Sequence, residues 1–480
     1  MSGVPQELPW ELPAEFDDVP VVLTAHPFQR VGAFALATLA EAESLEELSW
    51  TELVTGPWAE ITQPLLEAAE LSDAKEPGGF WLATSYMLWP NSKMNTTNRK
   101  RLSVQERREA TARWRSLPAP QDWPGVPCAL CSRSACGFYG KVDVPLAPST
   151  EYRNTTVPGH AGLALCVGCL ASFYALPWGC LVHRGRLSLI HSWDDEFLRR
   201  TVATQVVATR RQSWSLPSGG WEREQLLLDR VRGYSRPVHS DVSLMVFTNS
   251  NKEQEFAEYR MRQPLTAWLK RTQASGSRGK GLRALERSLT TKKVSGRAAL
   301  ARVLLHQPDR VPRLITNLIL AGAEAHTPAR VPGNAQTLHE LLSSYRREVL
   351  RMSDQQVREI EDLGARIAEI IQNHPKPLNG FVSAYRRGSR TLRKWVEEAT
   401  VTWLTWEREP KVVEPLAAPR LLRALFEYSD EAWLNRYTLF SATMAELQRR
   451  GFAPGSEDTE RVQEAIEQDL PNDDDDDEER

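Results

Sequence analysis

The sequence has few residues arranged as catalytic groups usually are. Among its nine histidines, the candidates for an acid–histidine group are His191, just before the acidic residues 194–196, and His239, near Asp241. Neither group has the spacing of a metal hydrolase or of a Ser-His-Asp triad. The stretch SGSRGKG lacks the GK[ST] ending of a phosphate-binding loop. We therefore expect that the protein is not an enzyme; an enzyme with an unrecognised site would need an activity that depends on His191 or His239.

Targeting and membrane signals are also missing from the sequence. The start, MSGVPQELPWELPAEF, has no basic region followed by an apolar run, so we expect no secretory signal and a cytoplasmic protein. One uncharged run, residues 161–182, has the length of a membrane span, but it contains Pro177, three glycines and a pair of cysteines. We predict that this run is a buried segment and that the protein has no membrane partner.

The small net charge of −3 conceals an uneven distribution. Residues 451–480 hold 13 acidic and 2 basic side chains, a net charge of −11, whereas residues 1–450 carry a net charge of +8. A block such as PNDDDDDEER repels itself, so we predict a disordered acidic tail over 451–480. Two interpretations stay open: a solvated tail, or a mimic that keeps stray nucleic acid away from a basic groove.

The length of 480 residues predicts more than one domain, because single cores usually stop growing near about 250 to 300 residues. Apolar runs predict strands at 186–193 and 241–249, among helices. From residue 336 the apolar spacing is helical only. The predicted fold class is α+β, with a mixed α/β N-terminal domain over 1–330 that includes a zinc-binding insertion at about 120–185. A four-helix bundle over 331–450 and the acidic tail follow.

Two CxxC elements are the strongest motif in the chain. Cys128 and Cys131 form the first pair, and Cys166 and Cys169 form the second. Four thiolates in two such pairs are typical of a structural zinc site, and thiols inside a cell are kept reduced. The sequence therefore predicts a closed Zn²⁺ site that stabilises a loop-rich region. Cys136 and Cys180, outside the ligand spacing, are expected to be small buried residues.

Two segments have the composition of nucleic-acid contacts. Residues 270–302 contain ten Lys or Arg and one acidic residue, as a glycine-rich stretch followed by a basic helix, which favours contact with phosphates. Residues 88–101, LWPNSKMNTTNRKR, resemble a flexible polar loop that can enter a groove. A solvated surface is the alternative for both. The candidate DNA-binding residues are Asn91, Ser92, Lys93, Asn95, Asn98, Arg99, Lys100, Arg101, Lys270, Arg271, Arg278, Lys280, Arg283, Lys292 and Lys293.

The order of these features resembles one family. A short apolar segment is followed by HPF and a helix of small residues. After these come an Asn-Ser loop, the paired CxxC elements with ALPWG, and the segment VFTNSNKEQEFAEYRMRQPLTAWL. This order is similar to the CXXC-CXXC class of CRISPR-associated proteins, the large subunits of type I Cascade complexes of subtypes related to A and B. The resemblance covers roughly residues 21–269. The HPF sequence departs from the more usual Asn-Pro-Phe.

The resemblance implies a non-catalytic large subunit of an RNA-guided surveillance complex. Such a subunit recognises the target-flanking motif (PAM) in duplex DNA, supports R-loop formation and recruits a helicase-nuclease, while guide pairing reads the sequence. The implied partners are guide RNA, target DNA, the backbone, 5′-handle-binding and small subunits, and a helicase-nuclease or transposition proteins. By analogy, residues 91–101 are assigned to the flanking motif or adjacent duplex, and residues 270–302 to the nucleic-acid backbone.

Two further expectations accompany the resemblance. In some relatives the helical bundle is also made separately as the small subunit, and here Met352 precedes a capping box of Ser353 and Gln356. A product that starts at Met352 has 129 residues and is expected to contain three helices and the acidic tail. The rival interpretation of the whole chain is a zinc-stabilised DNA-binding or regulatory protein that acts without guide RNA.

Overall fold

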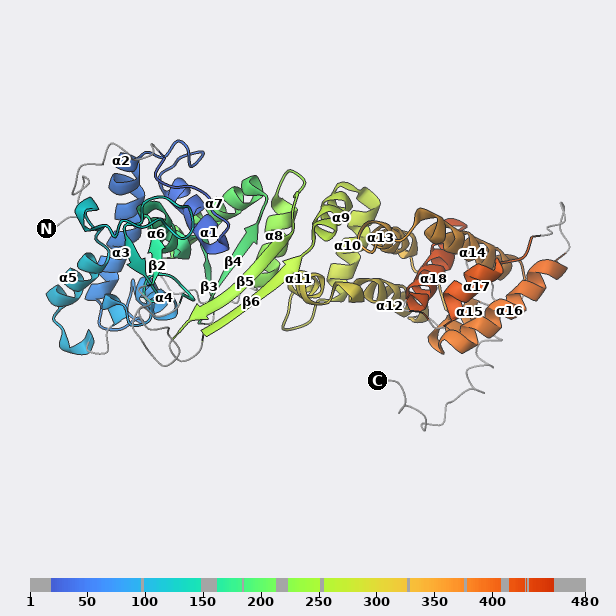
Figure 1. The fold of residues 1–480 in the computed structure, drawn as a ribbon. Helices are drawn as coiled ribbons and strands as arrows, with labels where there is room; N and C mark the ends of the chain where they lie inside the picture. Colours follow the sequence, from blue (N-terminus) through green and yellow to red (C-terminus); the bar gives the residue numbers. More distant parts are fainter. Residues whose placement is uncertain are drawn as a thin grey trace. The chain divides into compact units, whose positions relative to one another are not determined.

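The computed structural model describes residues 19–95, 99–147, 162–183, 185–212, 223–250, 254–325, 329–374, 378–406, 414–427, 429 and 431–452. The chain forms two compact units, Met1–Gln263 (unit 1) and Pro264–Arg480 (unit 2). Its fold is mixed helix and sheet, as predicted, and the strands of the described residues all belong to unit 1 (Figure 1). Most of the predicted acidic tail, residues 453–480, lies outside the described residues.

Unit 1 combines helices with two antiparallel sheets. Its helices are α1 (Pro27–Leu39), α2 (Trp50–Leu53), α3 (Ala59–Glu70), α4 (Phe80–Leu88), α5 (Val104–Trp114), α6 (Val167–Ala175), α7 (Asp195–Gln212) and α8 (Arg223–Gly233). Its strands are β1 (Gly137–Tyr139), β2 (Leu163–Leu165), β3 (Leu181–His183), β4 (Arg186–Ser192), β5 (Val242–Asn249) and β6 (Gln254–Met261). β1 pairs with β2, and the larger sheet has the order β3-β4-β5-β6.

The two predicted strands correspond to β4 and β5, which are neighbours in the larger sheet. All eight residues of β5 are buried, which explains its apolar sequence. β6 forms the edge of the sheet, and its residues alternate between more and less exposed positions. β6 is not among the predicted strands, because the charged residues of QEFAEYRM conceal the alternation of a half-buried edge strand.

The HPF sequence begins the central helix of unit 1. His26 is the N-cap residue of α1 and Pro27 occupies the first turn, where its missing N–H costs no helical hydrogen bond. The ring of Phe28 stacks on Phe247 of β5 with 4.5 Å between ring centroids. On another face of α1, Gly32 lies so close to the carbonyl of Ser172 in α6 that a Cβ atom has no room. The small residues of α1 therefore permit close packing against α6.

The uncharged run 161–182 does not form one long helix. Its described part divides into β2, α6, the 3-10 helix η5 (Leu176–Gly179) and the start of β3. The residues of α6 and η5 are all buried, as predicted for this run. Within the described ranges, every helix is too short or too polar to cross a bilayer.

Unit 2 is built from helices. They are α9 (Gln263–Ala274), which begins at the boundary, α10 (Gly276–Ser288), α11 (Gly296–His306), α12 (Val311–Glu324), α13 (Ala335–Glu348), α14 (Asp354–Asn373), α15 (Leu378–Arg386), α16 (Ser389–Thr405), α17 (Pro419–Phe426) and α18 (Ala432–Arg449). The predicted boundary at residue 330 falls inside this unit. Gly281 of α10 packs closely against Thr337 of α13, and Trp268 of α9 donates to the hydroxyl of Ser344 at 2.9 Å. α9 and α10 therefore share a core with α13.

The all-helical C-terminal bundle is confirmed, with more helices than the four predicted. α13, α14, α16 and α17 match the predicted apolar stripes, whereas α15 and α18 were missed. Both apolar and polar residues of α18 are buried, so its sequence lacks the one-sided pattern of a surface helix. The Ser353 hydroxyl caps α14 by accepting from the Gln356 N–H at 3.2 Å, which is one half of the predicted capping box.

Candidate metal centre and nucleic-acid surface

The first cysteine pair lies in a tight turn between two short extended segments. Pro127 and Ser134 form an isolated antiparallel bridge, and the Cys128 N–H donates to the Arg133 carbonyl at 2.6 Å. Ser132 closes the turn with a φ of 65°, in the left-handed region. The N–H of Ala129 donates to the carbonyl of Ala164 at 2.8 Å and so attaches the turn to β2. This geometry directs Cys128 and Cys131 toward the second pair.

The second pair stands where β2 leads into α6. Cys166 is the N-cap residue of α6, and its sulfur accepts from the Cys169 N–H at 3.5 Å. The Cys136 N–H donates to the Leu165 carbonyl at 2.8 Å, which continues the β1–β2 ladder up to Cys166. A helix N-terminus and its free N–H groups favour a negatively charged sulfur at this position.

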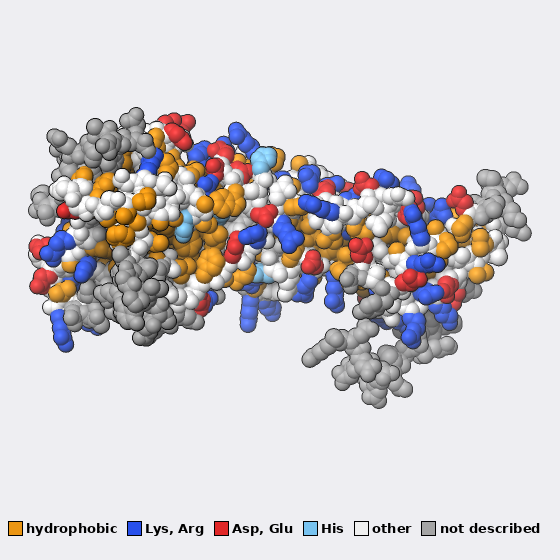
Figure 2. Space-filling view, in the orientation of Figure 1, with side chains coloured by type: hydrophobic (Ala, Val, Ile, Leu, Met, Phe, Trp, Pro, Cys, Tyr) orange, Lys and Arg blue, Asp and Glu red, His pale blue; other side chains and the backbone are white. Residues whose placement is uncertain are grey.

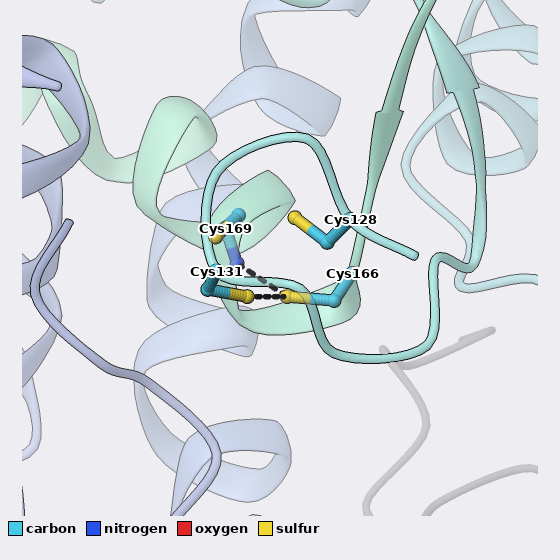
Figure 3. Close-up of side chains that lie close together, drawn as sticks. All are labelled: Cys128, Cys131, Cys166 and Cys169. Carbon is cyan, nitrogen blue, oxygen red and sulfur yellow. Dashed lines mark hydrogen bonds between the residues drawn. The ribbon is translucent and has the colours of Figure 1, made fainter. Parts of the chain in front are cut away.

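The four sulfur atoms meet in one cluster. All lie within 4.8 Å of one another, and the Sγ atoms of Cys131 and Cys166 are 3.4 Å apart (Figure 3). In a tetrahedral zinc site with Zn–S bonds of about 2.3 Å, neighbouring sulfurs are about 3.8 Å apart. The donor type, number and spacing therefore fit a metal ion such as zinc. Because all four ligands come from the protein, the site is closed and leaves no position for substrate.

The ionisation of the cluster suits a metal. Hydrogen bonds from the neighbouring thiols hold the pKa of Cys128 far below its usual range. The pKa values of Cys166 and Cys169 are raised, mainly because their protonated thiols hydrogen-bond to Cys128 and Cys131. Four thiolates together therefore require a bound cation. By contrast, burial raises the pKa of Cys136 to about 11, and Cys136 and Cys180 are buried outside the cluster, as predicted.

The cluster is joined to the core around α1. Arg133, in the first turn, donates to the Val19 carbonyl at 2.6 Å, and Gly168 of α6 lies against the carbonyl of Pro20. Gln29 of α1 donates to the Ser172 hydroxyl of α6 at 3.2 Å. The cysteine cluster is thus joined to α6 and to the segment that enters α1.

The predicted polar loop is more structured than expected. Lys93–Asn95 and Arg99–Arg101 form single 3-10 turns. Ser92 is fully buried, and Arg99 is buried with its guanidinium bonded to the carbonyls of Ala68, Ala69, Leu71 and Met94. These two residues are therefore corrected from DNA-binding to structural roles.

The remaining predicted residues of the loop divide into three groups. Asn95 is half-buried and bonds the Ser85 hydroxyl and the Trp89 carbonyl. Asn98 lies outside the described residues. The exposed residues that stay candidates for DNA contact are Asn91, Lys93, Lys100 and Arg101.

Asn249, which the sequence analysis did not list as a site residue, anchors this loop. Its amide donates to the carbonyls of Leu88 at 2.7 Å and Lys141 at 2.9 Å. Its Oδ1 accepts from the Leu146 N–H at 3.1 Å and from Gln254 at 3.0 Å. A fully buried side chain at the end of β5 thus fixes the chain just before the loop.

A second anchor is the guanidinium of Arg115, which lies against the rings of Trp89, Trp114 and Tyr174 at 3.6 to 4.4 Å from their centroids. Its nitrogens have no hydrogen-bond partner among the described residues, and burial lowers its pKa to about 10. Asp143 accepts from Trp114 and Tyr174. Cation–π contact holds Trp89, and with it the start of the loop, in a fixed position.

Most of the basic segment of unit 2 is helical: Gly276, Gly279 and Gly281 lie within α10 instead of forming the expected loose stretch, and Gly296 begins α11. Arg271 and Arg278 both pair with Glu348, at 2.6 and 2.7 Å, so their charges are partly neutralised. Lys270 is half-buried, and burial lowers its pKa.

Four other predicted cations of this segment are better placed for phosphate contact. Within the described ranges, they are exposed and have no ion-pair partner; they are Lys280, Arg283, Lys292 and Lys293. Figure 2 shows Lys and Arg side chains protruding where α10 is joined to α11.

Two acidic residues of the alternative active site, Asp194 and Asp195, have structural partners. Asp194 accepts from the Phe197 N–H at the start of α7 and from the His239 N–H at 2.9 Å. Asp195 pairs with Arg30. His191 is buried in β4, where desolvation lowers its pKa to about 4, so its imidazole is neutral at pH 7.

Comparison with known proteins adds no relative. Protein-family models, curated proteins and solved structures were searched, and none matches the chain.

Proposed function

We propose that this chain is a non-catalytic nucleic-acid-binding protein whose fold is stabilised by a structural zinc ion. The observation that carries the proposal is the set of exposed cations on α10 and the following loop, Lys280, Arg283, Lys292 and Lys293, which have no ion-pair partner within the described residues. Cations in such positions release counterions from phosphates on binding. The exposed Lys93, Lys100 and Arg101 supply a second set in unit 1.

The ion in the four-cysteine cluster is Zn²⁺ in this proposal, because four thiolates in a tetrahedral arrangement favour zinc over harder cations. Its role is to hold the turn of Cys128 and the start of α6 together. Removal of the ion with a chelator is expected to make the region around α1 more sensitive to proteases. No enzymatic activity is expected to depend on the ion.

The particular function proposed is the large subunit of a type I Cascade complex. The resemblance carried by HPF, the two CxxC elements with ALPWG and the FTNSN segment supports it. In this role, the anchored polar loop contacts the flanking motif in duplex DNA, and the basic surface of unit 2 contacts the nucleic-acid backbone. This role is compatible with target cleavage by a recruited helicase-nuclease and with guided transposition.

Purification of the tagged chain from its native cells, followed by sequencing of bound RNA, tests this function. The proposal predicts guide RNA of discrete length and other complex subunits. Duplex DNA bound tightly by the chain alone, with no RNA in the preparation, would instead support the rival, a zinc-stabilised DNA-binding or regulatory protein that acts without guide RNA.

A separate small subunit that begins at Met352 belongs to the same proposal. Such a product contains α14 to α18, five helices and not the three expected from the sequence. Gly364 of α14 lies against Ala442 of α18, so the product keeps this close helix pair. It loses α13 and with it Arg346, a buried guanidinium that bonds Asn435 and Thr438 of α18.

A further inference from the structure

An apolar groove of about 310 Å³ opens in unit 1 beside the start of α1. Its walls come from four separate parts of the chain: the HPF motif, residues 144–147, Leu163 of β2, and the last two strands of the larger sheet. Its lining includes His26, Phe28, Leu146, Met245 and Phe256. Figure 2 shows hydrophobic side chains gathered on this face of unit 1, around α1 and the strands of the larger sheet.

The groove has aromatic walls. Phe256 of β6 lies 6.4 Å from Phe28 between ring centroids, and 53% of its surface is exposed. Phe28 is itself held by its stack on Phe247 and by an edge contact with His26 at 5.7 Å. An exposed ring beside a fixed ring offers a flat surface on which a planar ligand stacks.

His26 supplies the polar side chain of the lining. Burial lowers the pKa of His26, so its imidazole is neutral at pH 7 and has one donor and one acceptor nitrogen. A ligand with apolar faces and a polar edge fits such walls better than an aliphatic side chain does, since an aliphatic group leaves the imidazole without a partner.

The groove is linked to the exposed cations of the polar loop. Leu146 in the groove wall donates its N–H to Asn249, and Asn249 donates to the carbonyl of Leu88, just before that loop. Lys93, Lys100 and Arg101 are exposed along the loop. These hydrogen bonds hold the groove wall to the chain that enters the polar loop, whose exposed cations can attract phosphates.

We propose that this groove binds an unpaired base of single-stranded nucleic acid, with Phe256 as the stacking surface and His26 at the polar edge of the base. A base in a duplex is covered on both faces by its neighbours, so only an unstacked base can enter. The proposal rests on the proposed nucleic-acid-binding function and adds to it the class of ligand and the residues of one site.

Fluorescence anisotropy of the full-length, zinc-loaded chain with labelled dT15 tests the proposal. Phe256→Ala is expected to weaken binding of dT15 about tenfold, because stacking on an aromatic side chain is lost. Phe256→Tyr keeps the ring and is expected to stay within about twofold of wild type. The matched control is Phe138→Ala, which removes another exposed phenylalanine, from β1 outside the groove. An abasic 15-mer with the same phosphates is expected to bind wild type and Phe256→Ala equally.

Each other result has a defined meaning. Equal binding of dT15 by wild type and Phe256→Ala overturns the groove proposal and leaves nucleic-acid binding intact. Wild-type protein that binds neither oligonucleotide nor duplex DNA overturns both proposals. Binding of N-acetyltryptophanamide that depends on Phe256, without any effect of Phe256→Ala on dT15, assigns the groove to a protein side chain and also overturns the proposal.

Discussion

Replacement of Asn249 by alanine tests how the polar loop is positioned. The Asn249 amide makes four hydrogen bonds, two as donor to the carbonyls of Leu88 and Lys141 and two as acceptor from Leu146 and Gln254. The Gln254 side chain is exposed and can hydrogen-bond to water instead. The three backbone groups, of Leu88, Lys141 and Leu146, lie in buried or half-buried surroundings. Asn249→Ala therefore leaves three backbone groups without their partner.

The expected loss follows from these three groups. An unsatisfied buried polar group costs about 1 to 3 kcal/mol, and the partly buried positions of Lys141 and Leu146 favour the lower value. The free energy of unfolding is expected to fall by about 3 kcal/mol. For a unit of this size, 1 kcal/mol corresponds to a shift of about 2 to 4 °C, so the melting transition of unit 1 falls by about 8 °C.

Calorimetry of the full-length protein measures this shift, and hydrogen exchange at the Leu146 amide locates it. The control is Gln105→Ala, which removes an exposed amide of α5 that bonds only to Glu109 among the described residues. Its transition is expected to stay within about 2 °C of wild type. The assignment of Asn249 as the anchor would be refuted if Asn249→Ala melts at the same temperature as wild type and its Leu146 amide remains protected from exchange.

Three further predictions concern the metal, a buried histidine and the internal methionine. Cys128→Ser is expected to lose bound zinc, measured by elemental analysis, and to give less soluble protein. A variant that folds normally and loses only nucleic-acid binding would contradict a structural role. The folded-state pKa of His191, about 4, lies below its unfolded value near 6.5, so stability is retained above pH 6.5 and lost as pH falls toward 4. By pH 4 this lowers the free energy of unfolding by up to about 3 kcal/mol. Urea unfolding at pH 7 and at pH 4.5 measures the difference, and His191→Asn is expected to abolish this pH dependence. Met352→Leu is expected to remove a short C-terminally tagged product, and a short band that persists would contradict the internal start.

The cluster of four cysteines could be predicted from the sequence because its geometry is local. Each CxxC pair brings two sulfurs to one turn, and the pairing of the two turns needs only the short β1–β2 ladder. The apolar sequence of β5 was likewise sufficient to predict a strand. These features depend on neighbouring residues, whose influence the sequence displays directly.

The roles of individual cations could not be predicted in this way. Arg99 is drawn into the core by carbonyls at the end of α3, about 30 residues earlier in the chain. Arg271 and Arg278 meet Glu348 on a helix about 70 residues later. Composition indicated a basic surface, but only the packing of distant helices determines which charges remain exposed.

The groove was missed for a similar reason. Phe28 lies in HPF and Phe256 in the segment after FTNSN, and they come together because Phe28 stacks on Phe247 of β5, which pairs with Phe256 of β6. The edge position of β6 leaves Phe256 exposed. Residue patterns along the chain do not reveal that these rings line one site.

The salt dependence of DNA binding by the double variant Lys280→Ala with Lys292→Ala tests the central claim most directly. Each lost phosphate contact changes the slope of log K against log salt by about 0.9, so the slope is expected to become shallower by about 1.8 with an unchanged circular dichroism spectrum. Weaker binding at low salt, with a difference that narrows as salt rises, is the predicted result. A slope and affinity equal to those of wild type would contradict the claim that this surface binds nucleic acid.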